Sequence, residues 1–158
     1  MVLRCPYITN MGQREKIVIY TDGGARGNPG PAAIGVVIRD KNSRMIKSYG
    51  KAIGTATNNE AEYQAVVFAL QKAKAILGGA KAKEMAVDMR MDSELVTCQL
   101  SGRYKIEEER LFSYFIKIWN LKMDFAGVSF THIPREKNKD ADRLVNEALD
   151  VKQEQISF

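Results

Sequence analysis

Residues 16–31 read KIVIYTDGGARGNPGP, and this stretch decides the fold. Its first part, Lys16–Thr21, is a β-branched and aromatic run typical of a strand, and it leads into the carboxylate of Asp22. The next residues, Gly23–Pro31, are rich in glycine and proline, which indicates a sharp turn. We therefore expect a strand that delivers an acidic side chain to a tight loop.

Two more strands are expected directly after this loop. Ile34–Ile38 and Met45–Ile53 are apolar and aromatic runs, and the polar segment Asp40–Ser43 lies between them. This pattern is typical of a β-hairpin. The first three strands should therefore form an antiparallel meander.

A helix follows the meander, because the apolar residues now recur at a helical spacing of about 3.6 residues. The apolar stripe consists of Tyr63, Val66, Val67, Leu70, Ala73 and Leu77. Thr57–Glu60 has the pattern of a capping box at the start of this helix, and Gly78–Gly79 ends it.

The rest of the chain alternates between strands and helices. In order, we expect a strand over Glu84–Met91, a short helix over Ser93–Leu100 closed by Gly102, a helix over Glu107–Met123, a strand over Val128–Ile133 and a helix over Asn138–Leu149. The inward residues of the last two helices should be Leu111, Phe115, Ile118 and Trp119, then Ala141, Leu144, Val145 and Ala148.

This order of elements predicts an α/β fold. We expect a five-stranded mixed sheet in which strands 4 and 5 run parallel to strand 1 and helices cover both faces. Parallel strands bring their carboxyl ends to one edge of a sheet, where the sites of α/β proteins usually form. Asp22 and Asp92 both lie at such ends.

Composition limits the domain organisation and the kind of partner. A chain of 158 residues, 45% hydrophobic and 27% charged, is enough for one domain. We expect a loose leader over residues 1–15, a folded domain over 16–150 and a tail over 151–158. The net charge of +5 suits a polyanionic partner, although many ordinary soluble proteins share it.

The sequence also bears on location and cysteine chemistry. It has neither an apolar run long enough for a membrane span nor the pattern of a signal peptide, so we expect a cytoplasmic protein that does not bind a membrane. Cys5 and Cys98 stand 93 positions apart with no second Cys or His at ligand spacing, which argues against zinc. A buried thiol is expected for Cys98, and a bridge to Cys5, unusual in a cytosol, is the open alternative.

Four acidic residues fall near the ends of the expected elements: Asp22, Glu62, Asp92 and Asp142. Each has an ordinary explanation, as a turn residue, a solvated helix residue, a helix cap beside Ser93 or a partner of a helix dipole. If they converge, however, their charges repel one another unless a cation lies between them. Mg²⁺ prefers such oxygen ligands, and two ions about 3.5–4 Å apart are a standard clamp for displacement at a phosphodiester.

Four ordered blocks resemble the motifs of type 1 ribonuclease H. They are YTDGGARGNPGP at 20–31, TNNEAEY at 57–63, MDS at 91–93 and PREKNKDADRL at 134–144. One TDG tripeptide would carry little weight, whereas four blocks in the family's order, on the expected strands and helices, are specific. The resemblance covers about residues 16–150 and implies the ribonuclease H-like fold, with 16–150 as the catalytic domain.

The resemblance implies an endonuclease that cuts the RNA strand of RNA–DNA hybrids and leaves 5′-phosphate and 3′-hydroxyl ends. It implies two Mg²⁺ ions, with Mn²⁺ as a possible substitute, no small-molecule cofactor and a monomeric enzyme. Asp22 would bridge both ions, and Asp142 would help to hold the ion that activates the water. Glu62 and Asp92 would hold the ion at the leaving 3′ oxygen.

The choice of Glu62 over Glu60 comes from the family register, because a helical wheel places both beside the apolar stripe. Glu60 is interpreted as the capping partner of Thr57.

The positions that match the family's contacts to 2′-hydroxyls are Gly23, Gly24, Asn28, Asn58 and Asn59. Asn28 has the alternative role of a turn former, and Asn58 and Asn59 that of ordinary first residues of a helix. Thr57 matches the pocket for a phosphate of the DNA strand, where a helix N-terminus offers backbone amides.

The chain departs from the family pattern in two places. Only Ser101–Ile106 stands where many members insert a basic helix and loop, so this chain looks like the handle-less, archaeal-like subgroup. We expect weaker, salt-sensitive binding through scattered Lys and Arg. The loop Pro134–Asn138 also lacks the histidine that many members carry there, and Arg135 or Glu136 is a possible replacement. His132, in the preceding strand, is interpreted as structural.

Three other functions compete with hybrid cleavage. A non-catalytic hybrid-binding module would not need all four carboxylates. A DNA-cutting enzyme of the same fold, such as a transposase or resolvase domain, fits the Asn58–Asn59 block less well. A nucleotide phosphate cradle at Gly23–Gly30 would need a Gly-Lys-Ser/Thr ending and a helix directly behind it, and the sequence has neither.

Overall fold

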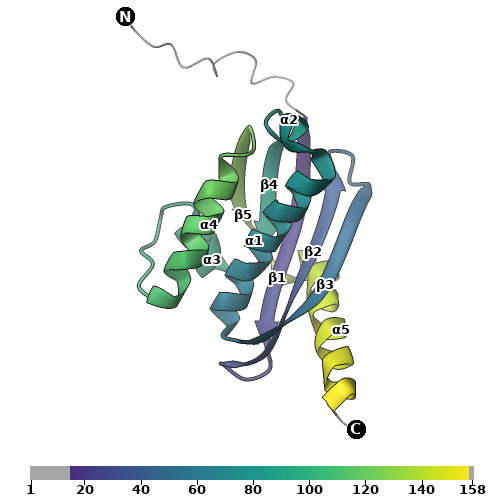
Figure 1. Cartoon of the computed structure of the whole chain (residues 1–158), viewed down its shortest axis with the longest axis vertical. Coiled ribbons are helices and arrows are strands. Elements are labelled where there is room, and N and C mark those ends of the chain that lie inside the picture. Colours follow the sequence, from purple (N-terminus) through teal and green to yellow (C-terminus); the bar gives the residue numbers. More distant parts are fainter. Residues whose placement is uncertain (1–14, 157–158) are drawn as a thin grey trace, which may run out of the picture.

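The computed structural model describes residues 15–156, which form a central sheet with helices on both faces (Figure 1). The strands are β1 (Lys16–Ala25), β2 (Gly30–Asp40), β3 (Met45–Ala56), β4 (Ala86–Met91) and β5 (Gly127–His132). The α-helices are α1 (Asn58–Leu77), α2 (Gly79–Ala82), α3 (Glu94–Leu100), α4 (Phe112–Lys122) and α5 (Lys139–Ile156). Two short 3₁₀ helices, η1 (Glu109–Leu111) and η2 (Arg135–Lys137), precede α4 and α5.

The sheet has five strands in the order β3-β2-β1-β4-β5. β1, β2 and β3 pair antiparallel, whereas β1 with β4 and β4 with β5 pair parallel. This arrangement confirms the predicted mixed sheet. The carboxyl ends of β1, β4 and β5 consequently point the same way.

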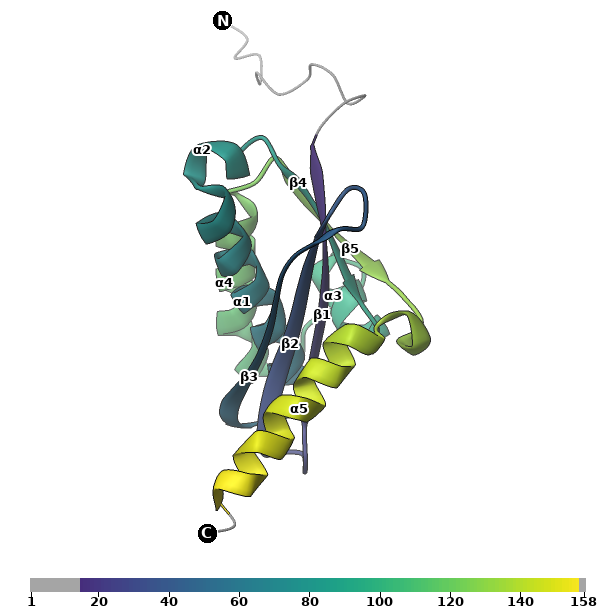
Figure 2. The same cartoon turned by 90° about the vertical axis from the view of Figure 1, so that its right-hand side faces the viewer.

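Helices cover both faces of the sheet, as predicted. α1 and α4 lie on one face and α5 lies across the other (Figure 2). The main core forms between the sheet and α1, where Ile19 and Met89 are fully buried together with Tyr63, Val66 and Leu70 of the predicted helical stripe. Burial of this apolar surface is the main favourable term in folding.

The glycine-rich segment is more strand-like than the sequence predicts. β1 continues past Asp22 to Ala25, and β2 begins at Gly30, so that Asp22 pairs with Gly35 inside the β1–β2 ladder. The pairing of β1 with β4 ends earlier, at Tyr20. β1 therefore stays paired with β2 beyond the residue at which its pairing with β4 ends.

The helices differ from prediction at two places. Trp119 was expected to face inward with Ile118, but its side chain is 56% exposed, so that expectation is wrong. The last helix continues beyond Leu149 to Ile156, because no Gly or Pro interrupts the residues that follow. Arg26, from the glycine-rich segment, pairs with Asp150 at 2.6 Å in this extension.

Several expectations concern residues 1–14 and 157–158, which lie outside the described residues. Cys98 is buried, as expected, whereas Cys5 lies outside the described range. The domain limits at 16 and 150 stay a prediction.

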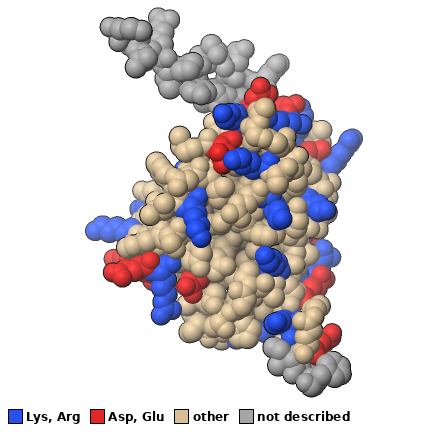
Figure 3. Space-filling model, viewed as in Figure 1, with Lys and Arg blue, Asp and Glu red and all other residues tan. Residues whose placement is uncertain are grey.

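Charge is spread over the face that carries α1 and α4. Lys and Arg are scattered there among uncharged residues, with Asp and Glu between them (Figure 3). Along the described part of the chain, every helix is too short or too polar to cross a membrane.

Candidate metal-binding site

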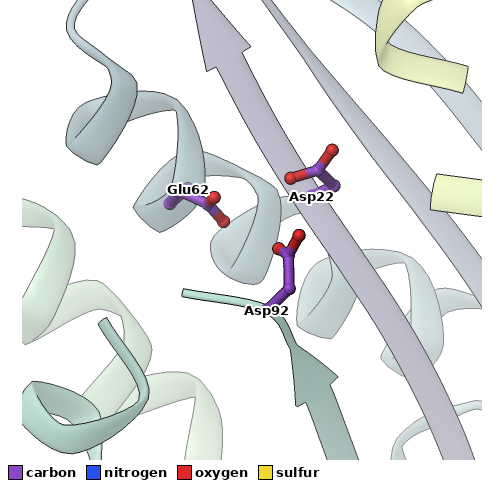
Figure 4. Close-up of side chains that lie close together, drawn as sticks. All are labelled: Asp22, Glu62 and Asp92. Atoms are coloured by element: carbon purple, nitrogen blue, oxygen red, sulfur yellow. The ribbon is translucent and has the colours of Figure 1, made fainter. Parts of the chain in front are cut away.

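Three carboxylates from different elements meet at one edge of the sheet. Asp22 of β1, Glu62 of α1 and Asp92, directly after β4, each offer an oxygen, and these oxygens lie within 4.8 Å of one another. Figure 4 shows the three side chains pointing toward one another. The sequence predicts that Asp22 and Asp92 converge, and they do so just beyond the end of the parallel β1–β4 pairing, although β1 itself continues to Ala25.

The separation of β1 from β4 opens the space for this cluster. Their last paired residues are Tyr20 and Arg90, so Asp22 and Asp92 stand just beyond the end of the parallel ladder. Glu62 lies in the second turn of α1, which packs on β1. The carboxylate of Glu62, on a helix that covers one face of the sheet, can therefore reach the carboxylates that β1 and β4 carry.

Gly23 sets the distance between β1 and α1. A Cβ atom built on Gly23 would lie 2.5 Å from the backbone nitrogen of Glu62 and still closer to the carbonyl group of Ala61. Real Cβ atoms essentially never come so close to backbone atoms. A residue without a side chain is therefore required here, which is a packing role beside the 2′-hydroxyl contact that the family register suggests.

Burial and mutual repulsion disturb the ionisation of two of these carboxylates. Asp22 is 8% exposed, and burial, followed by the charges of Asp92 and Asp142, raises its pKa from 3.8 to about 7. Burial and the charge of Asp22 hold the pKa of Glu62 well above its usual value. One oxygen of Glu62, Oε2, is buried with no hydrogen-bond partner among the described residues.

Such a donor set fits a hard cation. A divalent ion among the carboxylates would remove the repulsion between them and restore their ionised form. It would also give the buried Glu62 oxygen a partner. A buried polar atom without a partner costs free energy, so this contact would be favourable. The residues present therefore fit the metal that the sequence implies.

Asp142 lies on the same cleft but outside the tight group of three. The cleft has a volume of about 470 Å³, and its lining includes all four acidic residues. Asp142 stands in the first turn of α5 and raises the pKa of Asp22. The four predicted residues therefore line one cleft, with Asp142 beside the group of three.

The predicted substrate residues tie the glycine-rich segment to the start of α1. Asn58 accepts a hydrogen bond at Oδ1 from the backbone of Ala25, at 2.9 Å. The backbone of Asn58 in turn donates to Oδ1 of Asn28, at 3.0 Å. The NH₂ group of each amide takes no part in these two bonds, so the contacts engage only the acceptor of each side chain.

Thr57 and Glu60 form the predicted capping box, in which each side chain accepts a bond from the other's backbone. This result confirms the interpretation of Glu60 as a capping residue. Asn59 donates to Glu108 at 3.3 Å, and Gly24 lines the acidic cleft.

The two candidate replacements for the missing histidine lie on different clefts. Arg135 lines the acidic cleft, with its guanidinium 3.7 Å from Asp142, and its charge acts to lower the pKa of Asp22. Glu136 lines a neighbouring cleft with Tyr20 and Arg39. His132 is exposed at the end of β5, so it does not pack in the core as a structural residue would.

One buried residue beside the site was not singled out from the sequence. Asn138 is 1% exposed and lies between the carboxylate-bearing segments. The only local signal was an Asn at the start of a predicted helix, which also suits an ordinary cap.

The chain is similar in sequence and fold to several known proteins. A family model described as "Reverse transcriptase-like" matches residues 20–148. LC11-RNase H1, which was isolated from compost by a metagenomic approach, has a crystal structure in complex with an RNA/DNA hybrid. Its sequence is 49% identical to this chain, and the match covers 87% of this chain and 99% of that one with a TM-score of 0.82.

Two curated relatives are longer than this chain. Ribonuclease HI of Halobacterium salinarum is 39% identical over 135 residues, which are 85% of this chain and 65% of the relative. The bifunctional protein Rv2228c of Mycobacterium tuberculosis is 40% identical over 136 residues, 85% of this chain and 36% of the relative. The chain therefore spans about one third to two thirds of the length of these relatives.

Proposed function

Because the chain belongs to the type 1 ribonuclease H family, we propose that it is an endonuclease that hydrolyses the RNA strand of RNA–DNA hybrids. The observation that carries this proposal is the approach of Asp22, Glu62 and Asp92 to within 4.8 Å of one another at one sheet edge. LC11-RNase H1, with a similar fold, has been crystallised with an RNA/DNA hybrid.

The four acidic residues would hold two Mg²⁺ ions, with Mn²⁺ as a possible substitute. Glu62 and Asp92 would help to hold one ion and Asp142 the other. Asp22, whose pKa is raised by burial and by the charges of both Asp92 and Asp142, would contribute to both ions. When bound, the ions would supply the charge that activates water and stabilises the leaving 3′ oxygen. The carboxylates would keep the ions fixed while the scissile phosphate approaches from the open cleft, and the products would carry 5′-phosphate and 3′-hydroxyl ends.

Recognition of the RNA strand would fall to the segment around Asn28 and Asn58. Their engaged oxygens orient both amides, which leaves NH₂ groups as donors for 2′-hydroxyls. Gly23, Gly24 and Asn59 would contribute to the same surface. Thr57, the cap residue of α1, would hold a phosphate of the DNA strand at the positive end of the helix dipole.

The test is cleavage of three labelled duplexes of one sequence, an RNA–DNA hybrid, double-stranded RNA and duplex DNA, each with Mg²⁺ or Mn²⁺. We expect cleavage of the hybrid but not of duplex DNA. Asp92→Asn should lower the rate by orders of magnitude, whereas Glu84→Gln, at the opposite end of β4, should leave it unchanged.

Two outcomes would contradict the proposal. Hybrid binding without cleavage, with the wild type indistinguishable from Asp92→Asn, would identify a binding module. Preferred cleavage of duplex DNA would identify a DNA-cutting enzyme of this fold. The cytoplasmic location and the monomeric state stay predictions.

A further inference from the structure

The side chain of Asn138 connects two of the segments that carry the acidic cluster. Its Nδ2 donates to the carbonyl oxygen of Thr21 at 2.9 Å, directly beside Asp22 in the chain. The same Nδ2 lies 3.5 Å from Oδ1 of Asp92. Both partners are acceptors, so the amide nitrogen must face them.

The backbone of Asn138 reaches a third segment. Its carbonyl oxygen accepts the backbone N–H of Asp142 at 3.1 Å, in the first turn of α5. One residue therefore contacts Asp92, the backbone of Asp142 and the neighbour of Asp22.

The contacts of Asn138 are protected from water. Asn138 is 1% exposed and Thr21 is fully buried. A buried hydrogen bond is costly to lose, because the abandoned acceptor cannot turn to solvent instead. Water therefore cannot replace the amide of Asn138 at the carbonyl of Thr21 without local opening, whereas Asp92 lines the cleft and its contact with Asn138 is only partly buried.

We propose that Asn138 is a positioning residue of the metal site, which keeps Asp22, Asp92 and Asp142 at the spacing that a pair of divalent ions needs. This inference rests on the proposed function. It assigns no contact between Asn138 and the ions. Residues that orient metal ligands typically contribute 10–100-fold to metal affinity or activity, so the effect should be measurable.

The competing explanation is that Asn138 only begins α5. Two substitutions separate these roles, because Ser and Asp are as favourable as Asn at a helix start. Asn138→Ser removes the side-chain contacts without adding charge. Asn138→Asp keeps the size but places an acceptor against the carbonyl of Thr21 and the carboxylate of Asp92. Asn120→Asp, on the exposed side of α4, controls for the change in charge.

The first measurement is calorimetric titration of each full chain with Mn²⁺, without nucleic acid. We expect Asn138→Ser to bind about tenfold more weakly than the wild type and Asn138→Asp to bind more weakly still, while Asn120→Asp stays within twofold. The second is hybrid cleavage at varied Mg²⁺. The half-saturating Mg²⁺ concentration should rise about tenfold in Asn138→Ser, with the KM for hybrid within twofold.

Three outcomes would contradict the proposal, and the measurements distinguish them. A lower melting temperature with wild-type Mn²⁺ affinity in both Asn138 variants would make the residue purely structural and overturn the inference. Failure of both variants to fold would overturn it in the same way. If the wild type itself bound no Mn²⁺ and cut no hybrid, the proposed function would fail, and this inference with it.

Discussion

Gly23 and Glu62 pack so closely that a Cβ on Gly23 would stand 2.5 Å from the backbone nitrogen of Glu62. The contact joins β1 to α1 at the level of the acidic cluster. Gly24, the next residue, would place a Cβ at an ordinary 3.5 Å from a side-chain carbon of Val145. A methyl side chain would therefore clash at Gly23 but would fit at Gly24.

We predict that Gly23→Ala lowers the free energy of unfolding by about 3 kcal/mol, because overpacking against backbone atoms cannot be relieved by a change of rotamer. It should also lower the cleavage rate, since α1 would move and carry Glu62 away from Asp22. Urea unfolding of Gly23→Ala and Gly24→Ala checks the first point. Equal stability of the two variants would show that the contact between Gly23 and α1 leaves room for a side chain.

The acidic site was predictable from the sequence to the extent that it depends on topology. Asp22 and Asp92 stand two residues beyond the last paired residues of β1 and β4, and the parallel pairing of these strands brings the two carboxylates together. The choice of Glu62 over Glu60 needed the family register, because both lie beside the apolar stripe. The structure supplies the physical reason, since the side chain of Glu60 is used in the capping box with Thr57.

Features that depend on contacts between distant segments were not predictable. β1 extends through Ala25 because β2 continues to pair with it, whereas local composition indicated a turn. Asn138 bonds to residues 117 and 46 positions away, so no local pattern reveals its partners. Trp119 was misplaced because apolar residues occupy more than one side of α4, and the helical period alone does not say which side meets the core.

The stability of the metal-free protein should fall as the pH rises from about 4 to about 7. The folded-state pKa of Asp22 is about 7, above the ordinary value of 3.8, so the folded form binds more protons than the unfolded form in this window. Ionisation of Asp22 at higher pH then costs stability, by at most about 4 kcal/mol.

Thermal unfolding in a chelator at pH 5 and pH 8 measures this effect. The drop in melting temperature should be smaller in Asp22→Asn, which lacks the titrating group, and smaller in the wild type with Mg²⁺. Asp22→Asn should also be the more stable protein at pH 8 without metal, because a repelling charge has been removed. Identical pH profiles of the two chelator-treated proteins would contradict the assignment.

Asn58→Asp should weaken hybrid binding without weakening the fold. The substitution keeps the oxygen that accepts from the backbone of Ala25, and a carboxylate suits the N-terminus of α1. It removes the NH₂ donor proposed for a 2′-hydroxyl and adds a charge that repels phosphates. We expect the KM for hybrid to rise about tenfold, which corresponds to about 1.4 kcal/mol, with an unchanged melting temperature. A large loss of melting temperature would instead assign Asn58 to the fold alone.

Arg135 and Glu136 should differ in their effect on turnover, because only Arg135 lines the acidic cleft. The side chain of Arg135 is 80% exposed and its guanidinium lies 3.7 Å from Asp142, so it can meet a phosphate that enters the cleft. We expect Arg135→Ala to lower kcat about three- to tenfold and to make cleavage less sensitive to salt, since one phosphate contact is lost. Glu136→Ala should change kcat by less than twofold. Steady-state cleavage of a saturating labelled hybrid at two salt concentrations measures kcat for both variants. Arg135→Lys keeps the charge and should recover part of the rate. Unchanged turnover in both alanine variants would discard the idea that this loop replaces the missing histidine.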